Sequence, residues 1–311
     1  TDFIAECMHL EADADFAAEK VTIRVTTESG LSKVIEDADF CSSSVDPYIG
    51  SIYMRGGSGG GSVSADNIKI MITGDGVPAE PEIPSVLNYK SVYAFGDSIV
   101  FGHNDADNAF MNILSKRYAM KLTKYAANGA TVIDSGNDII AQVEKASEEE
   151  PDFIVFDGYT NDAYGDPETD TLNKDNHPDV TKLLGEPQGS SATEFDSSNF
   201  CGAFEEIIYT MKQKWPNAKI VFVTIHKSGA RNFDIQTELH DLTIKMCGEW
   251  GVEVVDIFND SDLDTRDPDQ MYQYMIGHTG SHPNVEACNK FYIPSVAAKL
   301  IELCGGETAA E

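Results

Sequence analysis

The stretch Ser91-Val-Tyr-Ala-Phe-Gly-Asp-Ser-Ile-Val-Phe-Gly102 decides the fold of the larger part of this chain. It opens with the apolar run 92–95, which is typical of a buried β-strand and is followed directly by Gly96-Asp97-Ser98. Strands that alternate with helices predict right-handed βαβ units and an α/β fold with a five-stranded parallel sheet. The further strands are predicted at 122–125, 153–156, 220–225 and 252–257, and the helices at 107–120, 139–146, 201–215, 235–247 and 285–301, the last kinked at Pro294.

Residues 1–79 are predicted to form a small all-β, sandwich-like domain. Segment 20–27 alternates apolar and polar residues and is rich in β-branched side chains, and segments 48–55 and 67–73 repeat this pattern. The Gly/Ser run 56–62 is either a hairpin loop or a flexible linker. Three prolines between positions 77 and 84 indicate a linker over 80–90, so the second domain spans 91–311.

The charge of the chain restricts its partners. With 22 basic and 52 acidic residues the formal net charge is −30, which repels phosphate backbones and anionic lipids. We therefore expect no nucleic-acid binding, and a neutral small-molecule or polysaccharide ester is the better substrate class. The sequence contains no run of about 18 apolar residues, so it predicts no membrane-spanning helix. The chain starts at Thr1 without an apolar signal segment, and we expect a mature, secreted protein whose export signal has been removed.

The six cysteines show no CxxC spacing, so a zinc site is not expected. Cys7 and Cys41 are candidates for a disulfide in the N-terminal region, and the remaining four are expected to be buried thiols. Neither HExxH nor EF-hand spacing occurs, and no Gly-x-Gly-x-x-Gly joins a strand to a helix. We expect neither a metal nor a cofactor.

Polar residues with acyl-transfer chemistry follow the predicted strands. Ser98, Gly129 and Asn161 come after the first, second and third strands, and His282 comes after the fifth. Ligands of open parallel sheets bind beyond the carboxyl ends of the strands, where these residues would meet. A hydroxyl, two oxyanion donors and an imidazole are the groups that nucleophilic ester hydrolysis requires. Each of these residues, taken alone, is common in turns and helix caps. The prediction of ester hydrolysis rests on all four occurring in this order.

That ordered set resembles the SGNH (GDSL-like) hydrolase family. FGDSIVFG at 95–102 is similar to the first family block, AANGAT at 126–131 to the second, GYTND at 158–162 to the third, and GSHPN at 280–284 to the last. The resemblance covers about residues 91–303 and implies a flavodoxin-like three-layer α/β/α sandwich. An α/β-hydrolase is a poorer match, because its Gly-x-Ser-x-Gly elbow requires glycine where Val100 stands.

The resemblance implies Ser98 as the nucleophile and His282 as the general base. It also implies an oxyanion hole formed by the N–H groups of Ser98 and Gly129 and the side-chain amide of Asn161. The family usually has an aspartate three residues before the histidine, where this chain has Thr279. Three explanations stay open: a Ser–His dyad oriented by a backbone carbonyl, an acid from elsewhere such as Asp256, or a weakened enzyme. We favour the dyad.

Further candidates for substrate contact or for orienting the site are Asp97, Asp162, His226, Asp256 and Thr279. The leading hypothesis is a serine esterase that removes short acyl groups from a carbohydrate, similar to secreted bacterial carbohydrate esterases. A lipase or thioesterase would use the same residues. The alternative from another class is a non-catalytic carbohydrate-binding protein with a degenerate SGNH-like domain, which Thr279 alone favours.

Overall fold

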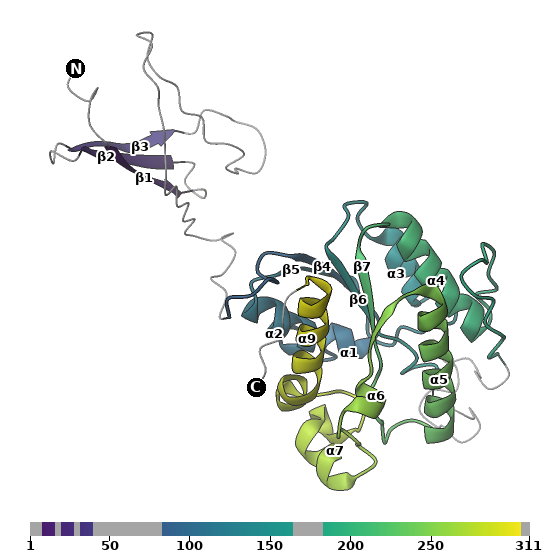
Figure 1. Ribbon diagram of the computed structural model, residues 1–311. Helices are drawn as coiled ribbons and strands as arrows, with labels where there is room; N and C mark the ends of the chain where they lie inside the picture. Colours follow the sequence, from purple (N-terminus) through teal and green to yellow (C-terminus); the bar gives the residue numbers. More distant parts are fainter. Residues whose placement is uncertain (1–7, 16–19, 28–31, 40–82, 164–182, 306–311) are drawn as a thin grey trace. The chain divides into compact units, whose positions relative to one another are not determined.

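The computed structural model describes residues 8–15, 20–27, 32–39, 83–163 and 183–305. The chain divides into two compact units, Thr1–Val77 and Pro78–Glu311 (Figure 1). Among the described helices, none has the length and apolar composition needed to cross a bilayer.

The first unit contains an antiparallel sheet of three strands in the order β1-β2-β3. The strands are β1 (Met8–Asp15), β2 (Lys20–Thr27) and β3 (Ser32–Asp39). In this register Leu10 lies opposite Val25, and Val25 lies opposite Lys33. The predicted strand 20–27 is confirmed as β2. The predicted strands 48–55 and 67–73, the Gly/Ser run 56–62, Cys7 and Cys41 lie outside the described residues.

The second unit is built on the predicted five-stranded parallel sheet, with the strand order β5-β4-β6-β7-β8. This order matches a flavodoxin-like sheet, in which the first strand of the domain lies between the second and the third. The chain leaves β4 on one side toward β5 and returns on the other side to β6, so the topological switch point is the end of β4. The strands are β4 (Ser91–Phe95), β5 (Lys121–Lys124), β6 (Phe153–Phe156), β7 (Lys219–Val223) and β8 (Glu253–Val255).

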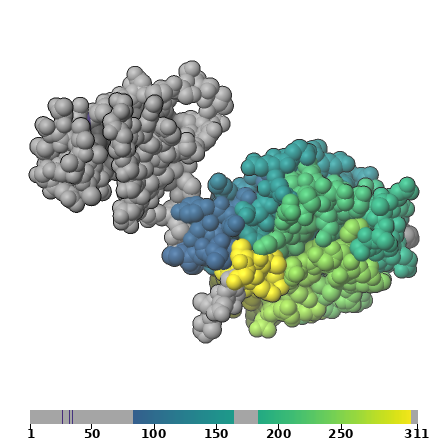
Figure 2. All heavy atoms as spheres, turned by 45° about the horizontal axis from the view of Figure 1, so that its top comes forward, coloured from purple at the N-terminus to yellow at the C-terminus, as the bar shows by residue number. Residues whose placement is uncertain are grey.

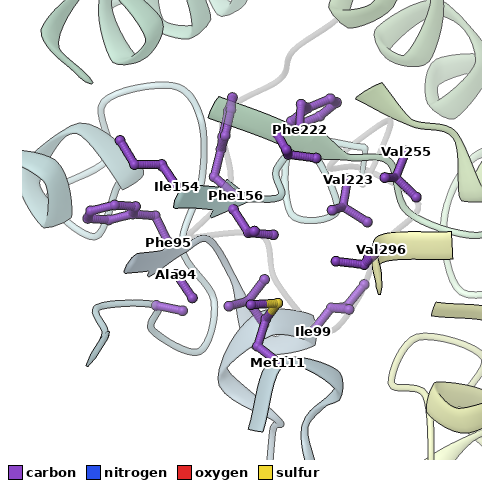
Figure 3. Packing of buried hydrophobic residues seen from close by; sticks show 14 of the residues in the cluster. Ala94, Phe95, Ile99, Met111, Ile154, Phe156, Phe222, Val223, Val255 and Val296 are labelled. Carbon is purple, nitrogen blue, oxygen red and sulfur yellow. The ribbon is translucent and has the colours of Figure 1, made fainter. Parts of the chain in front are cut away.

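Helices cover both faces of this sheet and complete the three layers (Figure 1). Successive strand residues point to opposite faces, and Figure 3 shows Ala94 and Val223 on the side of Met111 and Val296. On the other face the ring of Phe156 packs against Phe204 of α4, with centroids 5.8 Å apart. One face carries α3 (Ile139–Lys145), α4 (Phe200–Lys214) and α5 (Phe233–Trp250), and the other carries α1 (Ser98–Phe101), α2 (Phe110–Arg117) and α9 (Ile293–Leu303).

The predicted C-terminal helix 285–301 is interrupted rather than kinked. It consists of α8 (Val285–Ala287), a π-helical turn (Cys288–Tyr292) and α9. Proline has no N–H and its ring collides with the carbonyl four residues earlier, and the wider turn ahead of Pro294 relieves both problems. Five short helices were not predicted: α1, α6 (Ile257–Asp260), α7 (Pro268–Tyr274) and the 3-10 turns Ala106–Asn108 and Ile276–His278.

The beginning and the end of the second unit lie side by side on its surface (Figure 2). Here Arg117 Nη2 of α2 donates a hydrogen bond to Asn289 Oδ1 at 2.8 Å. Of the four cysteines described, three are buried free thiols as predicted, whereas the fourth, Cys304, is partly exposed. Burial raises the pKa of the Cys201 and Cys288 thiols to about 12, so both are unreactive packing residues.

Candidate active site

Ser98 lies at the carboxyl end of β4, as the first residue of the short helix α1. Asp97 caps this helix, because its Oδ1 accepts a hydrogen bond from Ile99 N at 2.8 Å. The first N–H groups of a helix have no partner within it, so the Ser98 N–H is available at the site. The sequence of strand, glycine, capping aspartate and serine therefore presents both the hydroxyl and a backbone donor at the switch point of the sheet.

The backbone before Ser98 is held by neighbouring elements. The Gln142 side chain of α3 accepts from Gly96 N and donates to Gly96 O, each at 2.9 Å. Asp97 N donates to Asp157 Oδ1 at 2.9 Å. Gly96 has φ +135°, and a β-carbon there would lie 1.7 Å from Asp157 Oδ1. Position 96 therefore requires glycine for both its conformation and its contacts.

Asp97 and Asp157 form a buried carboxyl pair beneath the nucleophile. Asp97 is fully buried, and the Oδ2 atoms of both residues have no hydrogen-bond partner in the structure. Burial raises the pKa of both groups, and the neighbouring Asp97 raises that of Asp157 further. Substrate contact, one of the two roles predicted for Asp97, is excluded by its burial; it positions Ser98 instead.

The structure brings Ser98 and His282 together across 184 residues of chain. Ser98 Oγ lies 2.9 Å from His282 Nε2, which is hydrogen-bond distance. The backbone around the imidazole is fixed by a short antiparallel bridge between Met275 and Pro283, and Ile276 N donates to His282 O at 2.8 Å. A hydroxyl in contact with a neutral imidazole is the arrangement that activates a serine nucleophile.

No carboxylate among the described residues contacts the imidazole of His282. Its Nδ1 atom has no hydrogen-bond partner in the described part of the chain. Thr279 is exposed, and its hydroxyl donates to Ile276 O at 3.2 Å. The predicted orienting role of Thr279 is therefore wrong for direct contact, because the side chain is committed to its own turn.

Asp256 also serves another partner. Its Oδ2 lies 3.0 Å from Nε2 of His240 on α5, and its Oδ1 accepts from Thr224 Oγ1 at 3.1 Å. Asp256 also caps α6 through Asn259 N. The hypothesis that Asp256 supplies the acid for His282 is wrong, because its carboxylate is bound to His240 and Thr224 as a structural anchor.

A cluster of donors behind His282 holds the loop in place. The carbonyl oxygen of Gly280 accepts from His226 Nε2 at 3.1 Å, from Ser228 Oγ at 2.9 Å and from Thr265 Oγ1 at 2.7 Å. We call these three side chains the Gly280 clamp. They reach the same oxygen from two separate loops, so the backbone two residues before His282 is fixed.

His226 is a positioning residue rather than a substrate contact. It is fully buried, and Tyr292 Oη lies 2.9 Å from its Nδ1. Burial lowers the pKa of His226 to about 4, so the ring is neutral and donates from Nε2 to Gly280 O. Of the two roles predicted for His226, the geometry fits orienting the site, because the buried ring leaves no surface open to substrate.

His282 is also neutral over most of the pH range. Partial burial, followed by the positive charges of His103 and Arg231, lowers its pKa to about 4. Burial disfavours the imidazolium form, and no described carboxylate opposes that effect. The imidazole can therefore accept a proton from Ser98 even in mildly acidic solution.

Asn161 follows β6 and lies next to the loop that follows β5. Its Nδ2 donates to Ala130 O at 2.8 Å, and its second amide hydrogen is free of any partner among the described residues. Asp162 accepts hydrogen bonds from Val132 N at 3.0 Å and Ile133 N at 3.1 Å. Asp162 is fully buried, so it braces the two loops against each other and cannot contact substrate as predicted.

Gly129 lies in the turn after β5, with φ +75°. The turn is held on both sides: Asn137 Nδ2 donates to Asn128 O at 3.0 Å, and Asn128 Nδ2 donates to His103 O at 3.3 Å. Because β5, β4 and β6 are adjacent, Gly129, Ser98 and Asn161 follow three neighbouring strand ends. This strand order is consistent with the prediction that Gly129, Ser98 and Asn161 meet at one edge of the sheet.

Two residues of the site were missed by the sequence analysis. Arg231 Nε donates to Thr160 O at 2.6 Å, and its Nη atoms lie 3.5 Å from Asn161 Oδ1 and from Ser281 Oγ. His103 stacks on His282, with ring centroids 3.8 Å apart and an interplanar angle of 10°. No sequence motif marks Arg231 or His103. The only signal in the sequence is that each residue lies shortly after the end of a predicted strand.

A narrow pocket opens beside Ser98 and His282. Its volume of about 10 Å³ is roughly that of one water molecule. Apolar side chains provide part of its wall, and Asp105 and Asn108 provide polar groups. The other lining residues are Ile99, Gly102, Ala109, Ile276, Pro283 and Val285. Among the described residues, no group of His, Cys, Asp and Glu has a geometry that could hold a metal ion.

Comparisons with known proteins agree with this fold. The model of the GDSL-like lipase/acylhydrolase family matches residues 94–288. The chain therefore belongs to the GDSL-like lipase/acylhydrolase family, a class of ester-hydrolysing enzymes. A search of curated proteins found no match.

Solved structures with a similar fold come from several bacteria. A protein of Lactobacillus plantarum is 20% identical, with a TM-score of 0.53 over 70% of this chain and 97% of that one. A possible lipase from Chitinophaga pinensis is 15% identical, with a TM-score of 0.51 over 69% and 99%. A family two carbohydrate esterase from Clostridium thermocellum, solved with cellohexaose, is 14% identical, with a TM-score of 0.46 over 70% and 65%. At these identities the likeness concerns the fold alone.

Proposed function

We propose that this protein is a serine esterase in which Ser98 forms an acyl-enzyme and His282 is the general base. The observation that carries the proposal is the 2.9 Å contact between Ser98 Oγ and His282 Nε2 at the switch point of the sheet. The lowered pKa of His282, about 4, keeps the base unprotonated at neutral pH.

In the proposed reaction, Ser98 Oγ attacks the ester carbonyl carbon and its proton passes to His282 Nε2. The oxyanion of the tetrahedral intermediate is bound by the N–H groups of Ser98 and Gly129 and by the amide of Asn161. Collapse of the intermediate expels the alcohol, which takes the proton from His282. Water then attacks the acyl-enzyme by the same route, releases the acid and restores Ser98.

The proposed substrates are short-chain acyl esters, above all acetyl esters, of a neutral carbohydrate. The pocket beside Ser98 is narrow, with a volume of about 10 Å³, which favours a small acyl group over a long chain. The net charge of −30 disfavours anionic acceptors such as phospholipid headgroups. A carbohydrate-binding role for the β-rich region 1–79 and an extracellular location are parts of this proposal. The predicted linker 80–90 belongs in part to the second unit, because Leu87 is buried in its core.

An acyl-chain profile tests the proposal. We expect hydrolysis of p-nitrophenyl acetate and of acetylated xylan, slower hydrolysis of the butyrate and none of the octanoate, and loss of all activity in Ser98→Ala. A preference for octanoate would favour the lipase or thioesterase alternative. Absence of turnover with every ester, together with binding of the polysaccharide, would favour the non-catalytic alternative.

A further inference from the structure

The imidazole of His282 needs a defined plane, because proton transfer from Ser98 requires Nε2 to point at the hydroxyl. In Ser–His–Asp triads a carboxylate on Nδ1 supplies this orientation. Here the Nδ1 atom has no partner among the described residues, and Thr279 is turned away to Ile276 O. The Gly280 clamp fixes the backbone of the loop but leaves rotation about the side-chain bonds of His282 free.

The ring of His103 lies where it can remove that freedom. It is nearly parallel to the His282 ring, at 10°, with a centroid distance of 3.8 Å. Half-buried stacked rings restrict each other's rotation, because tilting either one costs contact over a whole face. We propose that His103 is a positioning residue: its ring, stacked face to face on the ring of His282, fixes the plane of the general base in place of the usual carboxylate.

The loop that carries His103 is itself well anchored. Lys124 Nζ of β5 donates to Phe101 O at 2.7 Å and to Ala106 O at 2.9 Å, on either side of His103. His103 N donates to Ser98 O at 2.9 Å. Its backbone has φ +48°, an unusual conformation for a residue other than glycine. The stacked ring is therefore tied to the same short helix that presents the nucleophile.

Stacking by a histidine has a consequence that a phenyl ring would not have. When His103 carries a proton, its charge opposes protonation of the adjacent ring and helps to lower the pKa of His282 to about 4. Arg231 and the buried His226 act in the same direction. Asp105 lines the pocket beside His282. His103 thus holds the base in place and extends its working range toward acid pH.

This inference rests on the proposed esterase function, and its test compares three variants. His103→Asn removes the ring but suits a left-handed backbone; His103→Phe keeps a ring and removes the charge. His278→Asn is the matched control, because His278 has φ +58° and stacks on Tyr272 with centroids 4.1 Å apart, outside the dyad. Thermal unfolding identifies any variant that fails to fold.

With p-nitrophenyl acetate, we expect His103→Asn to lower kcat about 10-fold with KM changed less than about 2-fold, as the loss of one ring pair would do. His103→Phe should retain most of kcat, while the acid limb of its pH profile moves to higher pH. His278→Asn should match the native protein. A kcat of His103→Asn equal to that of the native protein would overturn the proposal. A loss of kcat in His278→Asn as large as that in His103→Asn would also overturn it.

A second readout does not depend on turnover. In protein labelled with ¹³C-histidine, the resonance of His282, assigned by its absence in His282→Gln, should titrate at higher pH in His103→Phe than in the native chain. Identical titrations would overturn the electrostatic part of the proposal even if no ester is hydrolysed. If the proposed esterase function itself is wrong, the protein will show no ester hydrolysis that depends on Ser98. That result is distinct from the titration of His282.

Discussion

The two sides of the Ser98–His282 pair are held by different kinds of contact. On the nucleophile side, buried side chains hold the backbone of Gly96 and Asp97, and the helix cap aims the serine. On the base side, the Gly280 clamp fixes the main chain, whereas the imidazole itself, among the described residues, has a hydrogen bond to Ser98 alone and a stacked ring, His103. The nucleophile is positioned by hydrogen bonds, and the base mainly by packing.

This difference has a chemical consequence. A carboxylate partner would stabilise the imidazolium that forms when His282 takes the proton, and would raise its pKa. With packing in its place, the pKa of His282 falls to about 4. His282 therefore stays unprotonated in mildly acidic solution, but it is a weaker base than a histidine paired with a carboxylate. The predictions below test each side in turn.

The largest effect is expected on the nucleophile side. Ser98→Ala should lower kcat for p-nitrophenyl acetate by at least about 10⁴-fold, because no other described group can form the acyl-enzyme. His282→Ala should be similarly impaired, and the double variant no worse than Ser98→Ala, since the two residues act as a unit. Additive losses would show that they act independently.

Asn161→Ala should lower kcat by about 10²-fold with little change in KM, because its amide would act on the oxyanion and not on the bound ester. The steady-state constants measure this split. Asn217→Ala is the control, because that exposed side chain precedes β7 and donates to Glu150 Oε2 at 3.1 Å, away from the proposed oxyanion hole. Equal losses in the two variants would assign Asn161 a structural role.

Asp162→Ala should lower the free energy of unfolding by about 2–3 kcal/mol, since it leaves the buried N–H groups of Val132 and Ile133 without acceptors. Urea denaturation measures the change, with the exposed Asp134→Ala as control. Unchanged stability in Asp162→Ala would contradict the bracing role.

Asp162 also predicts a pH dependence of stability. Burial raises its pKa to about 7. The folded state then binds a proton that the unfolded chain has already lost, so this group's contribution to stability falls as pH rises from about 4 to about 7. Asp162→Asn should show a weaker fall over that interval than the native protein. An equal fall in both would assign the dependence to other groups.

The smallest effect is expected from restoring an acid on the base side. Thr279→Asp should raise the pKa of His282 and shift the acid limb of kcat/KM to higher pH, with activity at pH 8 unchanged or raised by up to about 10-fold. Thr279→Asn is the uncharged control. Complete loss of activity in a folded Thr279→Asp would argue against this geometry.

The sequence was sufficient to predict the parallel sheet and to single out Ser98 and His282, whose side chains are in contact in the structure. Apolar runs such as 92–95 and 153–156 have the length of buried strands, and the long segments between them leave room for crossover helices. The strands β1 and β3 were missed because Ala, Asp and Glu, which occur in both, have weak strand propensity.

What sequence could not show were contacts between side chains from distant loops. His226 and Asp256 follow strand ends, as substrate ligands often do, yet their hydrogen bonds make both of them structural anchors. The stacking of His103 depends on a left-handed backbone at a residue that no pattern marks. Such details follow from the folded geometry and not from local residue preferences.

The pH dependence of kcat/KM tests the central claim most directly, namely that Ser98 and His282 work as a dyad without an orienting carboxylate. With a short-chain ester and the native protein, the acid limb should have its midpoint near pH 4, following the pKa of His282. A midpoint clearly above the ordinary histidine value of about 6.5 would contradict the account, because a carboxylate on His282 raises its pKa in that direction.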